Sequence, residues 1–222
     1  MAGSVPYGFL QEVRQMKKVI TIGREFGSGG REIGRRIAEK LQIAYYDQEI
    51  VTEISKRTKL SEKYVERITE DRPYMAYPVH AGMSFHTAYY AYTEFDRSLT
   101  VFAEQHNIIK ELAERSDCVI VGRCADYILK EKDPFRIFVY ADAESKLKRC
   151  RERSPEDENL SDSKIRRNIR SIDKGRARYY NYFSQQKWGA RENYDLLINT
   201  AGKDVKQISE AVADLVKKYL FD

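Results

Sequence analysis

Short apolar runs alternate along the chain with longer stretches in which apolar residues recur every three or four positions. The short runs are rich in β-branched residues, and several end at a glycine or a polar residue, which is typical of buried strands. Five such runs predict strands at Lys18 to Ile22, Ile43 to Tyr46, Cys118 to Val121, Phe135 to Tyr140 and Tyr194 to Ile198. Strands that alternate with helices in this way predict an α/β fold with a mainly parallel sheet covered on both faces.

The longer stretches carry the periodicity of helices. After the first predicted strand, Ile33, Ile37 and Leu41 recur every fourth residue, and the small residues Gly34 and Ala38 beside them permit close approach to a sheet. Further helices are expected at about 48–58, from near Asp142, and near the carboxyl end, where the predicted buried positions are Val205, Ile208, Val212 and Leu215.

The length of 222 residues predicts one α/β domain with modest insertions. We expect a tail at residues 1–16 and a single domain over residues 17–222. Within that domain, the segment from about 59 to 115 shows no strand pattern, so we expect a mostly helical insertion with an irregular centre around Pro73 and Pro78.

The net charge of the chain and its distribution limit the kinds of ligand that we expect. The net charge of +5 is compatible with nucleic acid, an anionic membrane or small phosphorylated ligands. Most of the excess lies between Lys146 and Lys187, mixed with acids and without a recognition motif, so nucleic-acid binding is not expected. A solvated helix face is the alternative interpretation of this stretch.

The cysteines and the apolar runs bear on the compartment. Cys118, Cys124 and Cys150 lack the spacing of a metal site and are odd in number, which favours a reducing compartment. No apolar run approaches the roughly 20 residues of a membrane span, and the first residues lack the apolar core of a signal peptide. We therefore expect a cytoplasmic protein that does not bind membranes.

A glycine-rich stretch lies between the first predicted strand and the helix that follows it. Consecutive small residues let backbone N–H groups converge on an anion, and the amino terminus of the helix adds its positive dipole. We expect this loop to bind the phosphates of ATP through Gly27, Ser28, Gly29, Gly30, Arg31 and Glu32. A tight strand-to-helix turn that binds no ligand is the alternative interpretation.

This stretch departs from the standard phosphate-loop pattern GxxxxGK[ST]. Gly30 stands where the lysine is expected, and neither Arg31 nor Glu32 after it is a magnesium-binding serine or threonine. The dinucleotide pattern GxGxxG fails as well, because Glu32 stands in place of its third glycine. Asp47 nevertheless follows the second strand, where a ribose-binding acid lies in dinucleotide enzymes, so a Rossmann-type enzyme stays an alternative.

Several motifs together resemble the cytidylate kinase-like family, a divergent branch of the P-loop nucleoside monophosphate kinases. The resemblance is carried, in matching order, by ITIGREFGSGGREIGRRIAEKL, YYDQEIV, VIVGRCADYIL, IDKGRARYYNYF and NYDLLINT. It covers nearly everything from Lys18 onward. It implies a three-layer fold, an acceptor-binding helical region at about 59–115, and a mobile lid at about 151–190.

The resemblance implies ATP-dependent phosphoryl transfer, with Mg²⁺, to a small phosphorylated acceptor such as CMP. Phosphoryl transfer depends on positioning and on cations around the transferred group, so an arginine can replace the missing lysine. Arg31 and Arg24 are the local candidates, and Arg31 is the one that we expect to be catalytic, together with Arg123, Arg176 and Arg178. A nucleotide-binding regulatory module that has lost turnover together with the lysine is the alternative from another class.

Arginines and acids downstream are the remaining site candidates. Arg123 follows a strand end, where its planar fork can grip a phosphate. By resemblance, Arg123 and Asp126 belong to the acceptor site, and a structural arginine–aspartate pair is the alternative. Arg176 and Arg178 fall in the lid-like segment, whose closure is expected to bring both guanidinium groups onto the transferred phosphate; solvated helix charges are the alternative.

Asp47 and the aromatic segment from Tyr74 to Phe95 complete the predictions. Asp47 is the best-placed acid for the water shell of Mg²⁺ or for orienting the acceptor, and capping of the next helix is an equal alternative. We expect the aromatic segment to form a small core or a self-association surface, as in a homodimer, rather than to stack on a base. Trp188 is expected to be a core anchor.

Overall fold

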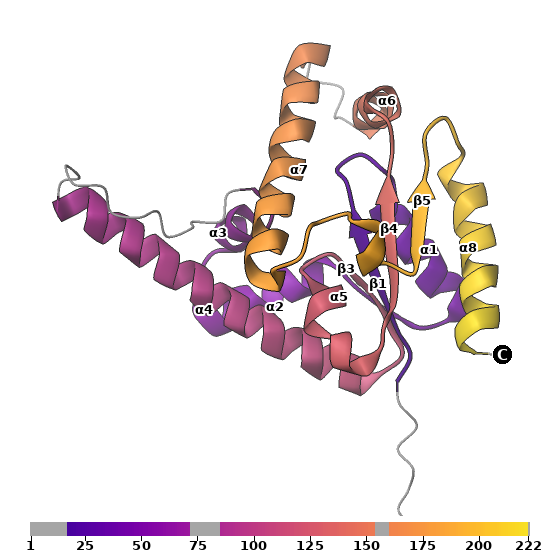
Figure 1. The fold of residues 1–222 in the computed structure, drawn as a ribbon, viewed down its shortest axis with the longest axis horizontal. Coiled ribbons are helices and arrows are strands. Elements are labelled where there is room, and N and C mark those ends of the chain that lie inside the picture. Colours follow the sequence, from indigo (N-terminus) through magenta and orange to yellow (C-terminus); the bar gives the residue numbers. More distant parts are fainter. Residues whose placement is uncertain (1–16, 72–84, 154–159, 222) are drawn as a thin grey trace, which may run out of the picture.

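The computed structural model describes residues 17–71, 85–153 and 160–221 (Figure 1). Its centre is a parallel sheet of five strands in the order β2-β3-β1-β4-β5. The strands are β1 (Val19–Arg24), β2 (Ala44–Tyr46), β3 (Cys118–Val121), β4 (Phe135–Tyr140) and β5 (Leu196–Asn199). The predicted mainly parallel five-stranded sheet is confirmed.

Several strand boundaries differ by one or two residues from the prediction, and the largest differences are at the end of β1 and the start of β5. β1 continues beyond Ile22 because Gly23 and Arg24 still pair with Phe138 and Val139 of β4. β5 begins at Leu196 rather than at Tyr194. The longer β1 brings Arg24 into the sheet at its carboxyl end, directly before the glycine-rich loop.

Helices cover both faces of the sheet, which confirms the three-layer α/β fold. One face packs against α1 (Gly30–Leu41) and α8 (Val205–Leu220), and the other against helices from the middle of the chain (Figure 1). The remaining α-helices are α2 (Gln48–Thr58), α3 (Glu62–Glu66), α4 (Phe85–Arg115), α5 (Ala125–Ile128), α6 (Ala143–Arg153) and α7 (Asp162–Ser184). Shorter turns are η1 (Arg67–Asp71), η2 (Lys130–Lys132) and η3 (Arg191–Asn193).

The face formed by α1 and α8 follows the predicted pattern with one exception. Ile33 and Ile37 are fully buried, and a Cβ added at Gly34 would lie 3.1 Å from Val121, so α1 approaches the sheet as closely as expected. Leu215, predicted to be buried, is 48% exposed. The buried stripe of α8 runs through Val216 instead, because the helical period places Leu215 on its outward flank.

The elements on the other face of the sheet position the candidate functional site. The turn η1 is a π-helical turn that follows α3 and contacts α7, and π turns often occur at functional sites. Helix α7 also contacts α6, where Leu147, Ile165 and Ile169 form a small apolar cluster with Phe26 of the glycine-rich loop. Helix α7 is thereby docked on the loop at one end and on η1 further along.

In the described part of the chain, none of the helices combines the length and the apolar character that crossing a membrane requires. The predicted tail at residues 1–16 and the aromatic residues Tyr74 and Tyr77 lie outside the described residues. Within the predicted aromatic segment, Phe95 makes an edge-on ring contact with Tyr182 of α7, and Tyr92 is 69% exposed. Self-association through this segment stays a prediction, as do the domain boundaries and the mobile lid.

Candidate functional site

The carboxyl ends of β1 and β3 lie side by side, and the chain turns sharply after each. β1 leads into the glycine-rich loop, while β3 leads into Gly122 and Arg123, with the Gly122 N–H donating to the Ile22 carbonyl at 2.9 Å. Ligands of parallel sheets bind beyond the carboxyl ends of the strands. The loop after β1 and the turn after β3 therefore frame the candidate site.

The loop presents open backbone donors to that space. Gly27 and Gly29 have positive φ angles of 75° and 87°, which glycine adopts without strain. The N–H groups of Gly27, Gly29, Arg31 and Glu32 have no hydrogen-bond acceptor among the residues that the structure describes. Converging free N–H groups at a helix amino terminus suit an anionic phosphate.

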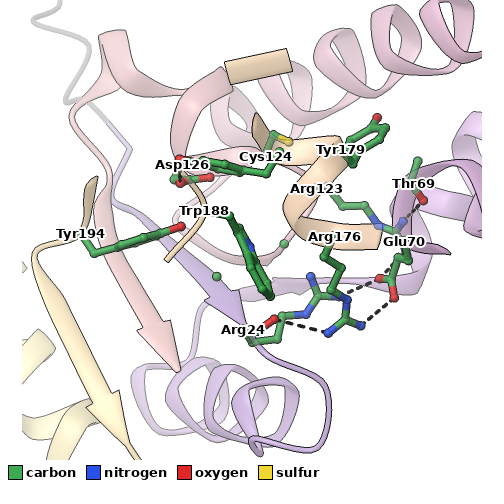
Figure 2. Close-up of a pocket in the computed structure, with 13 residues that line it drawn as sticks. Arg24, Thr69, Glu70, Arg123, Cys124, Asp126, Arg176, Tyr179, Trp188 and Tyr194 are labelled. Carbon is green, nitrogen blue, oxygen red and sulfur yellow. Dashed lines mark hydrogen bonds and ion pairs between the residues drawn. The ribbon is translucent and has the colours of Figure 1, made fainter. Parts of the chain in front are cut away.

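Beside the loop, three buried arginines from three elements surround one carboxylate (Figure 2). Glu70 of η1 lies 2.8 Å from Arg24 of β1, 3.3 Å from Arg123 after β3 and 2.7 Å from Arg176 of α7. The three arginine side chains are at most 9% exposed, and Glu70 is 20% exposed. We call these four residues the arginine cluster.

The arginine cluster holds three positive charges and one negative charge, so it carries excess positive charge. Burial alone would raise the pKa of Glu70, but the three neighbouring guanidinium groups lower this pKa well below its ordinary value. Burial and the charge of Arg24 lower the pKa of Arg176 to about 10, against the opposing effect of Glu70. The buried Nε atoms of Arg123 and Arg176 have no hydrogen-bond partner among the described residues. A further anion would find unsatisfied charge and donors here.

The other end of the same pocket is acidic and aromatic. Asp126 of α5 is buried, and its Oδ2 accepts a hydrogen bond of 2.7 Å from the Tyr180 hydroxyl. Burial raises the pKa of Asp126, although the hydrogen bond from Tyr180 opposes the shift. Figure 2 shows Asp126 and Tyr194 at this end, the arginine cluster at the other, and Trp188 between them.

The predicted alternative for Arg123, a structural pair with Asp126, is not what the structure shows. The guanidinium of Arg123 contacts Thr69 and Glu70 instead. Its carbonyl accepts a hydrogen bond of 2.8 Å from Gln105. Arg123 and Asp126 therefore line one pocket but face different ends of it.

A second pocket lies at the amino-terminal turn of α1 and is lined by the predicted residues Arg31, Glu32 and Asp47. Arg31 is 60% exposed, and its Nε lies 2.5 Å from Oδ2 of the buried Asp47. The Tyr45 hydroxyl lies 3.4 Å from the same carboxylate oxygen. Glu32 pairs with Arg36 and Arg153 and so faces away from the arginine cluster.

Arg31 pairs with Asp47, the residue that was predicted to contact the water shell of magnesium. Both carboxylate oxygens of Asp47 lie within hydrogen-bond distance of Arg31, so Arg31 competes with the water shell of an ion for these oxygens. The capping alternative is not observed, because Asp47 occupies the N-cap position of α2 without a capping side-chain hydrogen bond. Among the described residues, no group of three or more His, Cys, Asp or Glu side chains is arranged to hold a metal.

The two lid-like arginines lie in different surroundings although both belong to α7. Arg176 is buried in the arginine cluster, whereas Arg178 is exposed. Two residues along an α-helix correspond to a rotation of about 200°, which places them on opposite sides. Nearby on α7, Asp173 accepts a 2.6 Å hydrogen bond from the Phe26 N–H and a 2.7 Å bond from Lys146, which fixes α7 to the loop.

Three site residues were not predicted from the sequence. Glu70 and Thr69 lie in a π-helical turn inside a segment without any motif, so no signal marked them. Tyr180 lies within IDKGRARYYNYF, a motif that was recognised without assigning this residue a role. Trp188, predicted to be a core anchor, packs edge-on against Phe138 at 5.2 Å and also lines the pocket.

The chain matches one known protein family and is similar in fold to several solved structures. The model of the cytidylate kinase-like family matches residues 19–202. Among solved structures, the chain is similar to an uncharacterized protein from Eubacterium ventriosum, with 25% identity, a TM-score of 0.64, and coverage of 90% of this chain and 99% of that chain. No curated protein matches the chain significantly.

Shikimate kinases share the fold at lower identity. The enzyme from Bacteroides thetaiotaomicron has a TM-score of 0.53 and 15% identity, covering 91% of this chain and 98% of that chain. The enzyme from Acinetobacter baumannii, solved in complex with shikimate, has a TM-score of 0.52 and 16% identity, covering 94% and 97%. At this identity the likeness concerns the fold alone.

Proposed function

The chain belongs to the cytidylate kinase-like family, and from this premise we propose that it transfers the γ-phosphoryl group of ATP to a small acceptor that already carries a phosphate. The phosphates of ATP would bind the open N–H groups of the glycine-rich loop. The acceptor would bind in the pocket between β1 and β3, with its phosphate at the arginine cluster.

One observation carries this proposal. Three buried guanidinium groups converge beside a phosphate-type loop, and a single carboxylate balances only part of their charge. Burying charges that are not fully paired is costly, so such clusters are characteristic of sites that bind a charged ligand. A phosphate dianion offers the charge and the oxygen atoms that suit the planar forks of arginine.

The chemistry requires little beyond this arrangement. An oxygen of the acceptor's phosphate attacks the γ-phosphorus of ATP, the bond to the bridging oxygen breaks, and its electron pair leaves on ADP. No general base is needed, because the attacking oxygen is already anionic. Catalysis then rests on positioning and on cations around the transferred group. Mg²⁺ would arrive with ATP as part of the substrate, and Asp47 stays its proposed protein contact.

The opposite end of the pocket suggests the class of acceptor. Asp126 and the hydroxyl of Tyr180 provide hydrogen-bonding groups, and Trp188 provides an aromatic face. These groups suit a ring with amino or hydroxyl donors, such as a base or a ribose. A nucleoside monophosphate has both this ring and the phosphate, and CMP is the first candidate because of the family.

The test is acceptor-dependent ADP formation. Purified protein is incubated with MgATP and a panel of nucleoside monophosphates, in parallel with an Arg176→Ala variant. Arg167→Ala is the matched control, because Arg167 is an exposed arginine of the same helix. We expect one acceptor to stimulate ADP formation in wild type and Arg167→Ala but not in Arg176→Ala. ATP binding without turnover on any acceptor would favour the regulatory module instead.

A further inference from the structure

We propose that Arg24 supplies the positive charge that lysine supplies in the standard phosphate loop, and that its guanidinium contacts the transferred phosphoryl group. This inference rests on the proposed function and identifies which residue of this chain replaces the lysine. Two observations support it. The side chain of Arg24 fills the space beside Gly30 and Gly122, and the other cations near the loop form ion pairs or hydrogen bonds elsewhere.

The side chain of Arg24 fills the space from which a lysine at position 30 would extend. A Cβ added at Gly30 would lie 2.5 Å from the Cβ of Arg24 and 3.2 Å from its Cγ, closer than real Cβ atoms approach. A lysine at position 30 and an arginine at position 24 therefore exclude each other. The departure from the standard pattern is a displacement of the cation from helix α1 to the end of strand β1.

The guanidinium of Arg24 lies between the loop and the acceptor pocket. A Cβ added at Gly122 would lie 1.6 Å from its Nη1, so the guanidinium occupies the space directly over that glycine. Nη2 of the same group lies 2.8 Å from Glu70. The side chain of Arg24 thus extends from Gly30 of the loop to the other residues of the arginine cluster. In the proposed function, the transferred phosphoryl group passes along the same path from donor to acceptor.

The backbone of Arg24 is held more firmly than that of a loop residue. Arg24 pairs with Val139 in the sheet, and its carbonyl accepts a 3.3 Å hydrogen bond from Arg176. Its side chain is 8% exposed. A buried cation on a rigid strand is preorganised for stabilising charge, since it does not have to reorganise as the reaction proceeds.

The other cations near the loop are engaged elsewhere. Arg31 is 60% exposed and pairs with Asp47 in the second pocket. Lys146 lies 3.1 Å from Glu25 and 2.7 Å from Asp173. Arg149 donates to the carbonyl of Gly27 at 3.1 Å. Among the described residues, Arg24 packs against Gly30 and pairs with Glu70, whereas the ion pairs of Arg31 and Lys146 are with other carboxylates.

Moving the charge from position 24 to position 30 tests the proposal. The variants are Arg24→Gly, Gly30→Lys and the double variant Arg24→Gly/Gly30→Lys, which removes the obstructing Cβ and places a lysine in the standard position. Arg24→Ala/Gly30→Lys is the matched control, because alanine keeps the Cβ that obstructs the lysine. Thermal unfolding of each variant shows that the comparison is made among folded proteins.

We expect Arg24→Gly to lower kcat by about 10²- to 10³-fold, as when one stabilising donor is removed from an active site. The double variant Arg24→Gly/Gly30→Lys should regain at least about tenfold of that loss, which corresponds to one charge-assisted hydrogen bond. Arg24→Ala/Gly30→Lys should regain nothing. A folded double variant that is no faster than Arg24→Gly would overturn the proposal.

A binding measurement separates this proposal from the proposed function. A cation that contacts the γ-phosphate should favour a non-hydrolysable ATP analogue over ADP, so we expect Arg24→Gly to lose that preference and the double variant to regain it. If wild type turns over no acceptor, the proposed function fails, yet this preference still tests Arg24. An unchanged preference in Arg24→Gly would contradict the assignment of Arg24 whether or not turnover is found.

Discussion

The two pockets beside the glycine-rich loop both pair arginine with a carboxylate, but they differ in burial and in charge balance. In the arginine cluster, three buried guanidinium groups share the carboxylate of Glu70. In the second pocket, one exposed guanidinium, that of Arg31, pairs with one carboxylate, that of Asp47. In the second pocket the exposed guanidinium and the carboxylate balance each other, whereas a buried unbalanced cluster is costly until an anion binds.

The comparison separates residues that look equivalent in sequence. Arg24 and Arg31 flank the same loop, and Arg176 and Arg178 lie two residues apart on α7. The fold buries one member of each pair in the arginine cluster and leaves the other exposed. We therefore expect substitutions of the buried arginines to have larger effects than substitutions of the exposed ones.

The largest effect is expected for Arg123→Ala. This variant removes a fully buried guanidinium from the proposed acceptor-phosphate site, so kcat/KM for the acceptor should fall by about 10²- to 10³-fold. The KM for ATP should change much less, because the phosphates of ATP bind the loop. Steady-state kinetics with each substrate varied in turn makes the distinction. An equal fall of kcat/KM for ATP and for the acceptor would contradict the placement of Arg123 at the acceptor phosphate.

The next effect concerns stability and Glu70. Replacing Glu70 by Gln leaves three buried guanidinium groups without their shared charge, which should lower the free energy of unfolding by about 1–3 kcal/mol. Inorganic phosphate should raise the melting temperature of Glu70→Gln more than that of wild type, because the added anion replaces the lost carboxylate. Equal stabilisation of both proteins by phosphate would show that the cluster does not bind it.

The same residue gives a pH dependence with a definite sign. The pKa of Glu70 is lowered well below its ordinary value of 4.5 in the folded protein, so its contribution to stability is fully present above that value. The contribution is lost as pH falls from 4.5 toward the lowered folded pKa. Chemical denaturation between neutral and acid pH should therefore show a shallower loss of stability in Glu70→Gln than in wild type.

A smaller effect is expected for Arg31→Ala. The guanidinium of Arg31 is 60% exposed and pairs with Asp47 in the second pocket, away from the arginine cluster. We therefore expect kcat to fall by less than about tenfold, that is by less than about 1.4 kcal/mol. The comparison is made directly with Arg24→Gly under the same conditions. If Arg31→Ala proves the more damaging variant, Arg31 rather than Arg24 replaces the missing lysine.

The smallest effect is expected for Arg178→Ala, which should change kcat by less than about twofold, as is usual for an exposed charge. The measurement also tests the predicted lid. A large loss of kcat would show that α7 moves during turnover, far enough for its exposed side to reach the substrates. The hydrogen bond between Phe26 and Asp173 would then have to break or to move with the helix.

The fold was predictable because its signals are local and repeated. Strands such as Cys118 to Val121 are short β-branched runs, and the spacing of Ile33 and Ile37 marks a helical face, so both were located closely. The order of the motifs then identified the family. Leu215 was placed wrongly because a run of apolar residues along α8 does not say which flank of the stripe turns outward.

The site was predictable only in part, because it depends on contacts distant in sequence. Arg123 and Arg176 were found through their motifs, but the carboxylate that gathers them, Glu70, lies in a π-helical turn that no pattern predicts. From the sequence, Arg31 and Arg24 were the candidates for the lost lysine, and Arg31 was the one expected to be catalytic. The structure distinguishes them by the proximity of Arg24 to Gly30 and Gly122 and by the exposure of Arg31.

The most direct test of the central claim follows the phosphoryl group itself. Protein is incubated with ATP labelled in the γ-phosphate, Mg²⁺ and each nucleoside monophosphate, and the products are separated. We expect labelled nucleoside diphosphate from at least one acceptor, and its loss in Arg123→Ala. Label that stays in ATP or appears only as inorganic phosphate with every acceptor, although ATP binds, would contradict phosphoryl transfer by this protein.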